Sequence, residues 1–540
     1  MSGPLVCIIA AGRGTRMGFA EGALHKALAP LSNRAVLSHV LQSFPVDARF
    51  VVAVGHHADQ VRAYLGLAHP DRDVRFVTVD NYDGPGSGPG LSVLACAGAL
   101  GGEPFALAAA DGVVHAMPPL DGDTWMGASP VEDPTSYLTL ETDVAGDVHG
   151  LQERTGPSCL AYNGVAWIAA PETFFAGLRR GVSSGELQVT QGFQALLDAG
   201  VRVRAVGCRW TDAGTTETYA AARRAFAEYD SAGRSPIDVT YLLDDRVVKW
   251  FRDPEGANRR AARAAQLTDA IPAIVPAPPG WLAYEKASGT VLCDRMSAGE
   301  VRAVLDFASR SLWRERAGDE DFRAAARRFY GDKTLGRLRA YLTDRGWGEE
   351  PPSGWEINGV ATPTVAEALE RELDGLVGAA VPTVFHGDLH EGNIVAGPGG
   401  YRLIDWRDEF GGLADRGDLL YDLAKLLHSF ELPESVMHAR TFQRAEEPDG
   451  RGVAIEHPDT PLRAEARATL WTWCEEHGFD GRAIGVVDAL IWINMAPLYD
   501  RVLGDYLYAW GRWLLEVRGA GAIAEADLIR QLRGTPRTEA

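Results

Sequence analysis

The alternation of apolar and amphipathic stretches in this chain of 540 residues changes once, and that change limits the folds it can adopt. Up to about residue 229, short apolar runs such as residues 4–11 (PLVCIIAA) and 48–55 (ARFVVAVG) are followed by stretches with helical spacing. Strands that alternate with helices form a largely parallel sheet covered on both faces. We therefore expect an α/β domain with a mainly parallel sheet over residues 1–229.

The pattern differs from about residue 236. Residues 238–243 (DVTYLL) and 246–251 (RVVKWF) flank a turn of two aspartates, which predicts a hairpin. A helix-like stretch follows over residues 257–267, and beyond residue 297 the chain is mostly helical. A small β-rich lobe before a helical lobe is the order of a bilobal, protein-kinase-like fold. The expected domains are residues 1–229 and 239–540, joined by a linker at 230–238, with the small lobe ending near residue 290.

Composition excludes two classes of partner. The formal net charge is -20, whereas a protein that binds nucleic acid needs a basic face. No segment offers about 18 uninterrupted apolar residues, so no membrane insertion is expected. The six cysteines form no CxxC pair, and the first residues lack the basic region of a signal peptide. These features predict reduced thiols and a cytoplasmic location.

Lysine is rare in this sequence. The chain has 53 basic residues, of which only Lys26, Lys249, Lys286, Lys333 and Lys425 are lysines. The bias means that a surface charge is usually an arginine here. Each lysine is therefore a stronger functional candidate than it would be in a chain of average composition.

A polar segment, residues 386–393 (HGDLHEGN), precedes the run 401–406 (YRLIDW). Asp388 and Asn393 have the spacing of the protein-kinase catalytic loop. In that chemistry a carboxylate receives the proton of the attacking hydroxyl, and a neutral oxygen ligand five residues later holds magnesium. Asp405 supplies a second magnesium ligand, and Lys249, on a predicted strand, suits the α- and β-phosphates of ATP.

Three segments, FHGDLHEGNI, LIDWRDEFGG and GDLLYDLAKLL, carry a resemblance of residues 236–540 to the aminoglycoside phosphotransferase and choline kinase superfamily. The resemblance implies a kinase that acts on a small hydroxyl compound with ATP and Mg²⁺. It implies Asp388 as the catalytic base, Asn393 and Asp405 as metal ligands, and Lys249 and Glu285 as nucleotide-binding residues.

Some features of this region differ from protein kinases or allow two interpretations. Gly387 stands where protein kinases carry an arginine, which favours a small-molecule substrate. The helix predicted after Lys249 has no acid to pair with that lysine, and Glu255 is the nearest candidate. The aromatic residues within 471–478 and 491–517 suit either a cage for a cationic headgroup or a helical core, and their helical spacing favours the core.

The segment IIAAGRGTRMG, residues 8–18, ends a predicted strand and opens a loop. Its glycine spacing is not the dinucleotide fingerprint, and no P-loop is present. It offers a row of backbone N–H groups with Arg13 and Arg16 to cradle a triphosphate. Lys26 follows, and Asp111 and Asp212 lie at the ends of separate predicted strands, where two carboxylates can share a magnesium ion.

Together these residues make positions 4–228 similar to the sugar-1-phosphate and phosphocholine nucleotidyltransferase family, with a Rossmann-like domain. The resemblance implies that Lys26 and Arg16 stabilise the α-phosphoryl group while a phosphomonoester attacks it and pyrophosphate leaves. It places base binding at residues 87–94 and the acceptor at 162–168, and Arg154 where many relatives have lysine. The implied nucleotide-binding residues are Ala11, Gly12, Arg13, Gly14, Thr15, Gly88 and Ser92; the substrate-binding residues are Arg154, Asn163 and Gly164; the metal ligands are Asp111 and Asp212.

One half would make a phosphomonoester and the other would consume it. The sequence therefore predicts a bifunctional enzyme that phosphorylates an amino alcohol, polyol or sugar with ATP and then couples it to a second NTP, with CTP favoured, giving an NDP-activated product and pyrophosphate. Two alternatives stay open: an aminoglycoside-type drug-modifying kinase with a non-catalytic N-terminal domain, and a nucleotide sensor or scaffold without turnover. The sequence does not indicate an oligomeric state.

Overall fold

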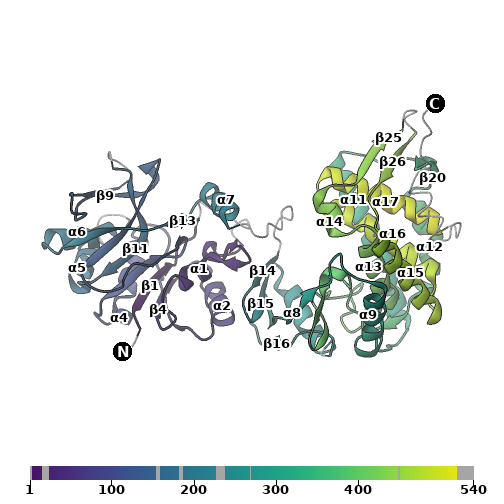
Figure 1. Ribbon diagram of the computed structural model, residues 1–540, viewed down its shortest axis with the longest axis horizontal. Helices are drawn as coiled ribbons and strands as arrows, with labels where there is room; N and C mark the ends of the chain where they lie inside the picture. The colour runs from purple at the N-terminus through teal and green to yellow at the C-terminus, as the bar shows by residue number, and fades with distance from the viewer. Residues whose placement is uncertain are drawn as a thin grey trace. The chain divides into compact units, whose positions relative to one another are not determined.

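The protein is described from a computed structural model (Figure 1). The structure describes residues 3–14, 23–153, 158–181, 186–226, 238–267, 269–447 and 451–519. These residues form two compact units. The first unit takes the described residues up to Arg252 together with residues 276–283, and the second takes residues 253–275 and those from Tyr284 onward.

The first unit is built on a nine-stranded mixed sheet. Four parallel strands run in the order β6-β1-β4-β5, as the alternation of strands and helices predicts. The sheet then continues through antiparallel strands that this pattern did not indicate, because β11 pairs with β6, β8 and β9. The strands are β1 (Leu5–Ala10), β4 (Arg49–Val54), β5 (Asp73–Thr78), β6 (Phe105–Ala109), β8 (Thr124–Pro130), β9 (Leu138–Thr142), β10 (Val148–Glu153), β11 (Leu160–Ile168) and β12 (Val203–Gly207).

Both faces of the parallel strands are buried. Cys7 and Val51 belong to a core cluster on one face, packed with residues of α3, α5 and α6. Val6 and Ile8 point to the opposite face because side chains alternate along a strand, and they are also fully buried. The helices of this unit are α1 (Val36–Gln42), α2 (Ala58–Ala68), α3 (Pro89–Ala95), α4 (Ala97–Leu100), α5 (Pro171–Gly181), α6 (Thr190–Asp198) and α7 (Thr216–Ala225), with short strands β2 (Pro30–Leu31), β3 (Arg34–Ala35), β7 (Gly112–Val114) and β13 (Trp210–Asp212).

The predicted hairpin is confirmed, and its strands pack into the core of the first unit. β14 (Asp238–Leu242) and β15 (Arg246–Phe251) pair in antiparallel fashion, and the short strands β16 (Ile274–Val275) and β17 (Trp281–Glu285) follow in the chain. Tyr241 is fully buried, its hydroxyl donates to Leu28 O at 2.5 Å, and its ring centroid lies 4.7 Å from that of Tyr64. The strand pair that carries Lys249 is therefore part of the first unit.

The second unit is mainly helical, and α13 is buried along its whole length. The unit also contains a hairpin of β22 and β23 and a four-stranded sheet of β19, β20, β25 and β26, which the sequence did not indicate. The helices are α8 (Pro254–Ala264), α9 (Ala298–Ser311), α10 (Glu320–Arg327), α11 (Lys333–Arg345), α12 (Val365–Ala379), α13 (Leu419–Glu431), α14 (Glu434–Ala439), α15 (Pro461–Glu476), α16 (Gly481–Met495) and α17 (Arg501–Gly519). The strands are β18 (Thr290–Val291), β19 (Trp355–Ile357), β20 (Val360–Thr362), β21 (Pro382–Thr383), β22 (Ile394–Gly397), β23 (Gly400–Leu403), β24 (Gly417–Asp418), β25 (Gln443–Glu446) and β26 (Gly452–Glu456).

The aromatic residues of the C-terminal region form core, as their spacing favoured. Trp492, Trp510 and Trp513 are each at most 1% exposed. Within the described residues, Gly481–Leu498 is the one segment apolar and long enough to cross a membrane by composition, and 67% of it is buried inside the unit. Figure 1 shows α16 lying among α13 and α17, which is the position of a core helix.

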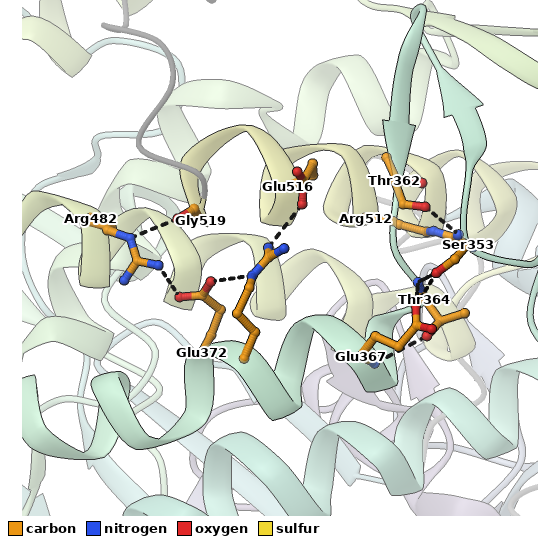
Figure 2. Close-up of polar contacts among 10 residues, drawn as sticks. Ser353, Thr362, Thr364, Glu367, Glu372, Arg482, Arg512, Glu516 and Gly519 are labelled. Atoms are coloured by element: carbon orange, nitrogen blue, oxygen red, sulfur yellow. Dashed lines mark hydrogen bonds and ion pairs between the residues drawn. The ribbon is translucent and has the colours of Figure 1, made fainter.

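Ion pairs and backbone contacts fix α17 to the rest of the second unit, as Figure 2 shows. Glu372 on α12 is 2% exposed and accepts from Arg482 Nη2 at 2.5 Å. Arg371, its neighbour, bonds Glu516 of α17 at 3.0 Å. Arg512 of α17 is 1% exposed and donates to Thr362 O at 3.2 Å. These contacts tie α12, α17 and the β19–β20 hairpin together.

Replacing Tyr241 by alanine should destabilise the first unit by about 3–5 kcal/mol, because it removes a fully buried ring and leaves Leu28 O without its donor. Urea denaturation followed by circular dichroism measures the change. The control is Thr240→Ala, since Thr240 is exposed on the same strand. This change should alter the free energy of unfolding of the first unit by no more than about 0.5 kcal/mol. Equal effects of the two changes would contradict this packing.

Candidate active sites

Asp388, Asn393 and Asp405 come together in the second unit. Asn393 Nδ2 donates to Asp388 O at 2.9 Å and lies 3.4 Å from Asp388 Oδ2. Ile404 N donates to Asn393 O at 3.0 Å, which fixes the segment carrying Asp405 beside the segment carrying Asp388. Asp405 adopts a left-handed backbone, with φ of 62°, and accepts from Tyr284 OH at 3.3 Å. The three residues predicted for proton acceptance and metal binding therefore share one site.

The buried carboxylate of Asp422 on α13 holds in place the segment that carries Asp388. Its two oxygens accept from His386 N and Gly387 N, each at 2.7 Å, and from Trp313 Nε1 at 3.0 Å. Burial raises the pKa of Asp422 to about 6, and these hydrogen bonds act in the opposite direction. Gly387 has φ of 85°, and a Cβ there would lie 2.6 Å from Arg407 Cβ. The glycine is thus required by the backbone as well as being consistent with a small-molecule substrate.

Lys425 contacts Asp388 directly and was missed from the sequence as a site residue. Its Nζ lies 2.9 Å from Asp388 Oδ1, and 8% of Lys425 is exposed. Burial alone would raise the pKa of Asp388, but the charge and hydrogen bond of Lys425 hold that pKa well below its usual range. Asp388 is therefore ionised at neutral pH. The rarity of lysine was the signal that could have identified Lys425.

Arginines of helix α8 contact the segment that follows Asp405. Arg259 Nη2 donates to Asp408 Oδ2 at 2.8 Å. Arg263, which is 1% exposed, donates to Phe385 O at 2.5 Å and also to Arg407 O. Burial lowers the pKa of Arg263 to about 10, so it remains charged at neutral pH. Glu255, the nearest acid to Lys249 in the sequence, lies exposed in the first turn of α8.

The predicted nucleotide-binding residues Lys249 and Glu285 lie on different strands, Lys249 in the first unit and Glu285 in the second. Lys249 is half-buried on β15, in register with Thr240 of β14. Glu285 is the exposed last residue of β17, and its backbone N–H donates to Ala273 O at 2.9 Å. Their roles in holding ATP remain predictions.

In the first unit, a second cluster of polar side chains consists of Lys26, Asp111 and Asp212. Lys26 Nζ lies 2.7 Å from Asp111 Oδ2. Ala213 N donates to Asp111 O, and Asp212 on β13 pairs with Gly112 on β7, so the two aspartates lie side by side. Burial raises the pKa of Asp212, and the charge of Asp111 raises it further, while Gly214 N and Tyr137 OH donate to its oxygens at 2.9 Å.

The glycine-rich loop reaches this group. Gly14 has φ of 65°, and a Cβ there would lie 2.5 Å from the Lys26 side chain, so only glycine lets the loop approach the lysine. Arg13 bonds Asp83 at 2.7 Å on the surface, which links the loop to residues 79–88. Thr15, Arg16 and Arg154 lie outside the described residues.

A cavity of about 670 Å³ opens beside Asp111 and Asp212. Its lining combines aromatic rings with further acids, and it includes the predicted acceptor segment at Tyr162, Asn163 and Gly164. The Asn163 side chain is also structural, since it donates to Ser129 Oγ at 3.2 Å. The other lining residues used below are Glu132, Asp133, Tyr137, Trp210 and Glu217.

The remaining predicted nucleotide-binding residues lie in the glycine-rich loop and at the start of α3. Ala11 is buried, and its carbonyl accepts from His56 N at 2.9 Å. Gly88 precedes α3 with φ of 128°, and Ser92 is buried one turn into that helix. Gly12 lies in the glycine-rich loop, and a Cβ there would contact nothing within 4 Å. The loop therefore has open space on this side.

The oxygen donors present suit magnesium. Among the described residues no group of three His, Cys, Asp or Glu side chains could hold a metal by itself. Mg²⁺ is commonly bound by one or two carboxylates together with substrate phosphates and water. Asp111 with Asp212, and Asn393 with Asp405, are donor sets of this type.

Comparison with known proteins identifies two transferase domains. Residues 6–125 match the family described as MobA-like NTP transferase domain, and residues 310–457 match the phosphotransferase enzyme family. The N-terminal match confirms the resemblance to nucleotidyltransferases, and the C-terminal match confirms the resemblance to the aminoglycoside-type phosphotransferases. The chain therefore combines a nucleotidyltransferase domain with a phosphotransferase domain.

Two curated relatives support the nucleotidyltransferase half. The Bifunctional protein GlmU of Paraburkholderia phymatum is 28% identical over 216 residues, which is 37% of this chain and 46% of that protein. The protein of the same name from Burkholderia mallei is 43% identical over 83 residues, covering 15% of this chain and 17% of that protein. The chain thus spans less than half the length of these relatives.

Solved structures similar to this chain match over the same half. They include UDP-glucose pyrophosphorylase complexed with UDP-glucose, at 17% identity and a TM-score of 0.36, covering 41% of this chain and 98% of that one. The inositol-1-phosphate CTP transferase from T. maritima has 14% identity and a TM-score of 0.36, covering 43% of this chain and 99% of that one. The fold assignment rests on the sheet topology described above.

Replacing Asp422 by alanine should leave the N–H groups of His386, Gly387 and Trp313 without their acceptor, at a cost of about 1–3 kcal/mol for each buried group. We expect a lower unfolding temperature of the second unit and loss of any phosphotransferase activity. Calorimetry and an ADP-release assay measure the two effects. An unchanged melting transition would contradict the anchoring role of this carboxylate.

Proposed function

We propose that this protein is a bifunctional enzyme that first phosphorylates a hydroxyl group of a small acceptor with ATP. It then couples the resulting phosphomonoester to a second NTP, for which we propose CTP, and releases pyrophosphate. The main support is that each unit brings together the side chains that its reaction needs. Lys425 and Asn393 contact Asp388 in the second unit, and Lys26 contacts Asp111 beside Asp212 in the first. CTP is proposed only from the resemblance to phosphocholine nucleotidyltransferases.

In the kinase reaction, Asp388 would accept the proton of the acceptor hydroxyl as its oxygen attacks the γ-phosphorus of ATP. Lys425 supports this step because it keeps the Asp388 carboxylate ionised and oriented. Asn393 Nδ2 is used by Asp388 O, which leaves the amide oxygen as the group that would hold Mg²⁺ with Asp405. Bound Mg²⁺ neutralises phosphate charge and orients the transferred group.

In the nucleotidyl transfer, an oxygen of the phosphomonoester would attack the α-phosphorus of the NTP, and the bond to pyrophosphate would break. Lys26 would stabilise the charge that develops on the α-phosphoryl group, together with Arg16. Asp111 and Asp212 would hold Mg²⁺, which their adjacent positions beside the cavity support. The backbone N–H groups of the glycine-rich loop would bind the triphosphate.

The cavity beside Asp111 supports a polar organic acceptor. Tyr137 and Trp210 provide flat surfaces, with ring centroids 5.6 Å apart, and Glu132, Asp133 and Glu217 provide carboxylates that accept hydrogen bonds from hydroxyl or ammonium groups. These features suit a polyol, a sugar or an amino alcohol. We place the activity in the cytoplasm, consistent with six free cysteines.

The alternative proposal is an aminoglycoside-type drug-modifying kinase with a non-catalytic N-terminal domain. The close contact of Lys26 with Asp111, and the position of Asp212 next to them, argue against it. A domain that had lost catalysis would have no need to keep a half-buried lysine and two adjacent acids beside a cavity.

Replacing Asp388 by asparagine should lower ADP formation by roughly 100- to 10,000-fold, because the group that receives the hydroxyl proton is lost. Nucleotidyl transfer to a phosphomonoester made beforehand should continue at its normal rate. Chromatography of the nucleotides measures both reactions. Asp415→Asn, an exposed aspartate of the same unit, is the matched control. Loss of both activities in the folded Asp388 variant would contradict two independent sites.

Replacing Asp111 by alanine should have the reverse effect, because one of the two carboxylates that would hold Mg²⁺ is lost. Pyrophosphate release should stop while ADP forms normally, so the phosphorylated acceptor accumulates and can be seen by mass spectrometry. Asp59→Ala, on the exposed side of α2, serves as the control. Continued pyrophosphate release in the Asp111 variant would show that this carboxylate is not needed.

A further inference from the structure

Four basic side chains of the second unit lie near one another, and one of them contacts Asp388. Two lie one turn apart on α11, so they share a face of that helix. The third follows Asp405 by two residues, and the fourth is the α13 lysine that contacts Asp388. We call them the cation cluster: Lys333, Arg337, Arg407 and Lys425.

Two aromatic rings, those of Phe329 and Tyr421, lie beside Lys333 and Arg407. Lys333 Nζ lies 3.8 Å from the ring centroid of Phe329 and 6.0 Å from that of Tyr421. The guanidinium carbon of Arg407 lies 5.3 and 5.9 Å from the same two centroids. Tyr421 precedes Lys425 by one turn of α13, and Lys425 Nζ is 2.9 Å from Asp388 Oδ1. The cluster thus extends from α11 to the carboxylate proposed to accept the proton.

Lys425 is the one member of the cluster that forms an ion pair within the described residues, although the charges of Asp388, Asp408 and Glu409 also act on Arg407. Asp388 pairs with Lys425, but in the part of the chain that the structure describes no carboxylate lies within 4.0 Å of the charged nitrogens of Lys333, Arg337 or Arg407. Burial lowers the pKa of Lys333 well below that of a free lysine, and the charges of Arg407 and Arg337 lower it further. Partly buried like charges are costly, and a bound anion relieves that cost.

The cluster is on the helical side of the site. Its members come from α11, from the segment after β23 and from α13, whereas kinase-like folds hold the α- and β-phosphates of ATP with a lysine of the small β-rich lobe, here Lys249. Cations on the helical side are therefore available to the second substrate. An acceptor that was itself a cation, such as an amino alcohol, would be repelled by them.

We propose that the acceptor of the phosphoryl group carries a carboxylate or a phosphate, which binds Lys333, Arg337 and Arg407 while its hydroxyl meets Asp388. This inference rests on the proposed kinase function and narrows its substrate class to hydroxylated anions, such as a sugar acid or a sugar phosphate. The hydroxyl proton passes to Asp388, the acceptor oxygen bonds to the γ-phosphorus, and the bond from that phosphorus to ADP breaks.

Binding to the full chain tests the inference with matched probes. Glycerate and glycerol 3-phosphate are the carboxylate and phosphate probes, gluconate and glucose 6-phosphate are their larger counterparts, and glycerol, glucose and ethanolamine are the neutral and cationic ones. Isothermal titration should detect the anions but neither glycerol nor ethanolamine. The class of anion that binds with higher affinity identifies whether the acceptor carries a carboxylate or a phosphate. Absence of binding by every anion would overturn the inference.

Variants locate the binding to the cluster. Arg337→Met keeps the length and helical propensity of the side chain and should weaken anion binding by roughly 30-fold or more. Lys333→Met should do the same, while Arg339→Met, an exposed residue of the same helix, should leave anion binding unchanged. Anion binding that is equal in the Arg337 and Arg339 variants would overturn the inference.

A kinetic measurement separates this inference from the proposed function. With ATP and Mg²⁺, the Arg337 variant should raise the KM for the anionic acceptor and leave the KM for ATP close to its original value. Phosphorylation of glycerol or ethanolamine at a rate that Arg337→Met does not change would overturn the inference and leave the kinase proposal intact. Anions that bind at the cluster but receive no phosphate would instead contradict the proposed kinase function.

Discussion

The Asp422 carboxylate accepts hydrogen bonds from two consecutive backbone N–H groups of the segment that carries Asp388, and α13 buries it completely. The same helix provides Lys425, which contacts Asp388, and Tyr421, which packs beside Lys333 and Arg407. Because α13 is buried along its whole length, its position is fixed by the core, and the core thereby sets the geometry of the site. Asp388, its lysine partner and the cation cluster all contact this one helix or the segment that it holds.

Much of the fold and part of the site could be predicted from local sequence. The parallel strands, the hairpin that carries Lys249 and the spacing of Asp388, Asn393 and Asp405 are local patterns, and the structure confirms their arrangement. The antiparallel half of the large sheet and the β19–β26 sheet depend on pairing between distant residues, such as Glu356 with Gly452, which no local pattern reveals. Lys425 was missed for the same reason, because it is near Asp388 only in space.

Lysines lie beside a proposed site residue in each of the two units. Lys26 pairs with Asp111, Lys425 pairs with Asp388, and Lys333 belongs to the cation cluster. Lysine is a compact point charge whose pKa responds to burial, whereas arginine stays charged and binds carboxylates with a planar fork. In this chain arginines such as Arg263 and Arg512 hold backbone carbonyls in place, whereas Lys26 and Lys425 lie where a phosphate is proposed to react.

The central claim is that the second unit makes a phosphomonoester and that the first unit couples this phosphomonoester to an NTP. Incubation of the full chain with Mg²⁺, ATP labelled at the γ-phosphate, unlabelled CTP and hydroxylated acids or sugar phosphates tests it, with mass spectrometry of the products. The account predicts a CDP-linked product that carries the label in the phosphate next to the acceptor, together with unlabelled pyrophosphate from CTP. Label found only in inorganic phosphate, or in a phosphorylated acceptor that never becomes CDP-linked with CTP or any other NTP, would contradict it.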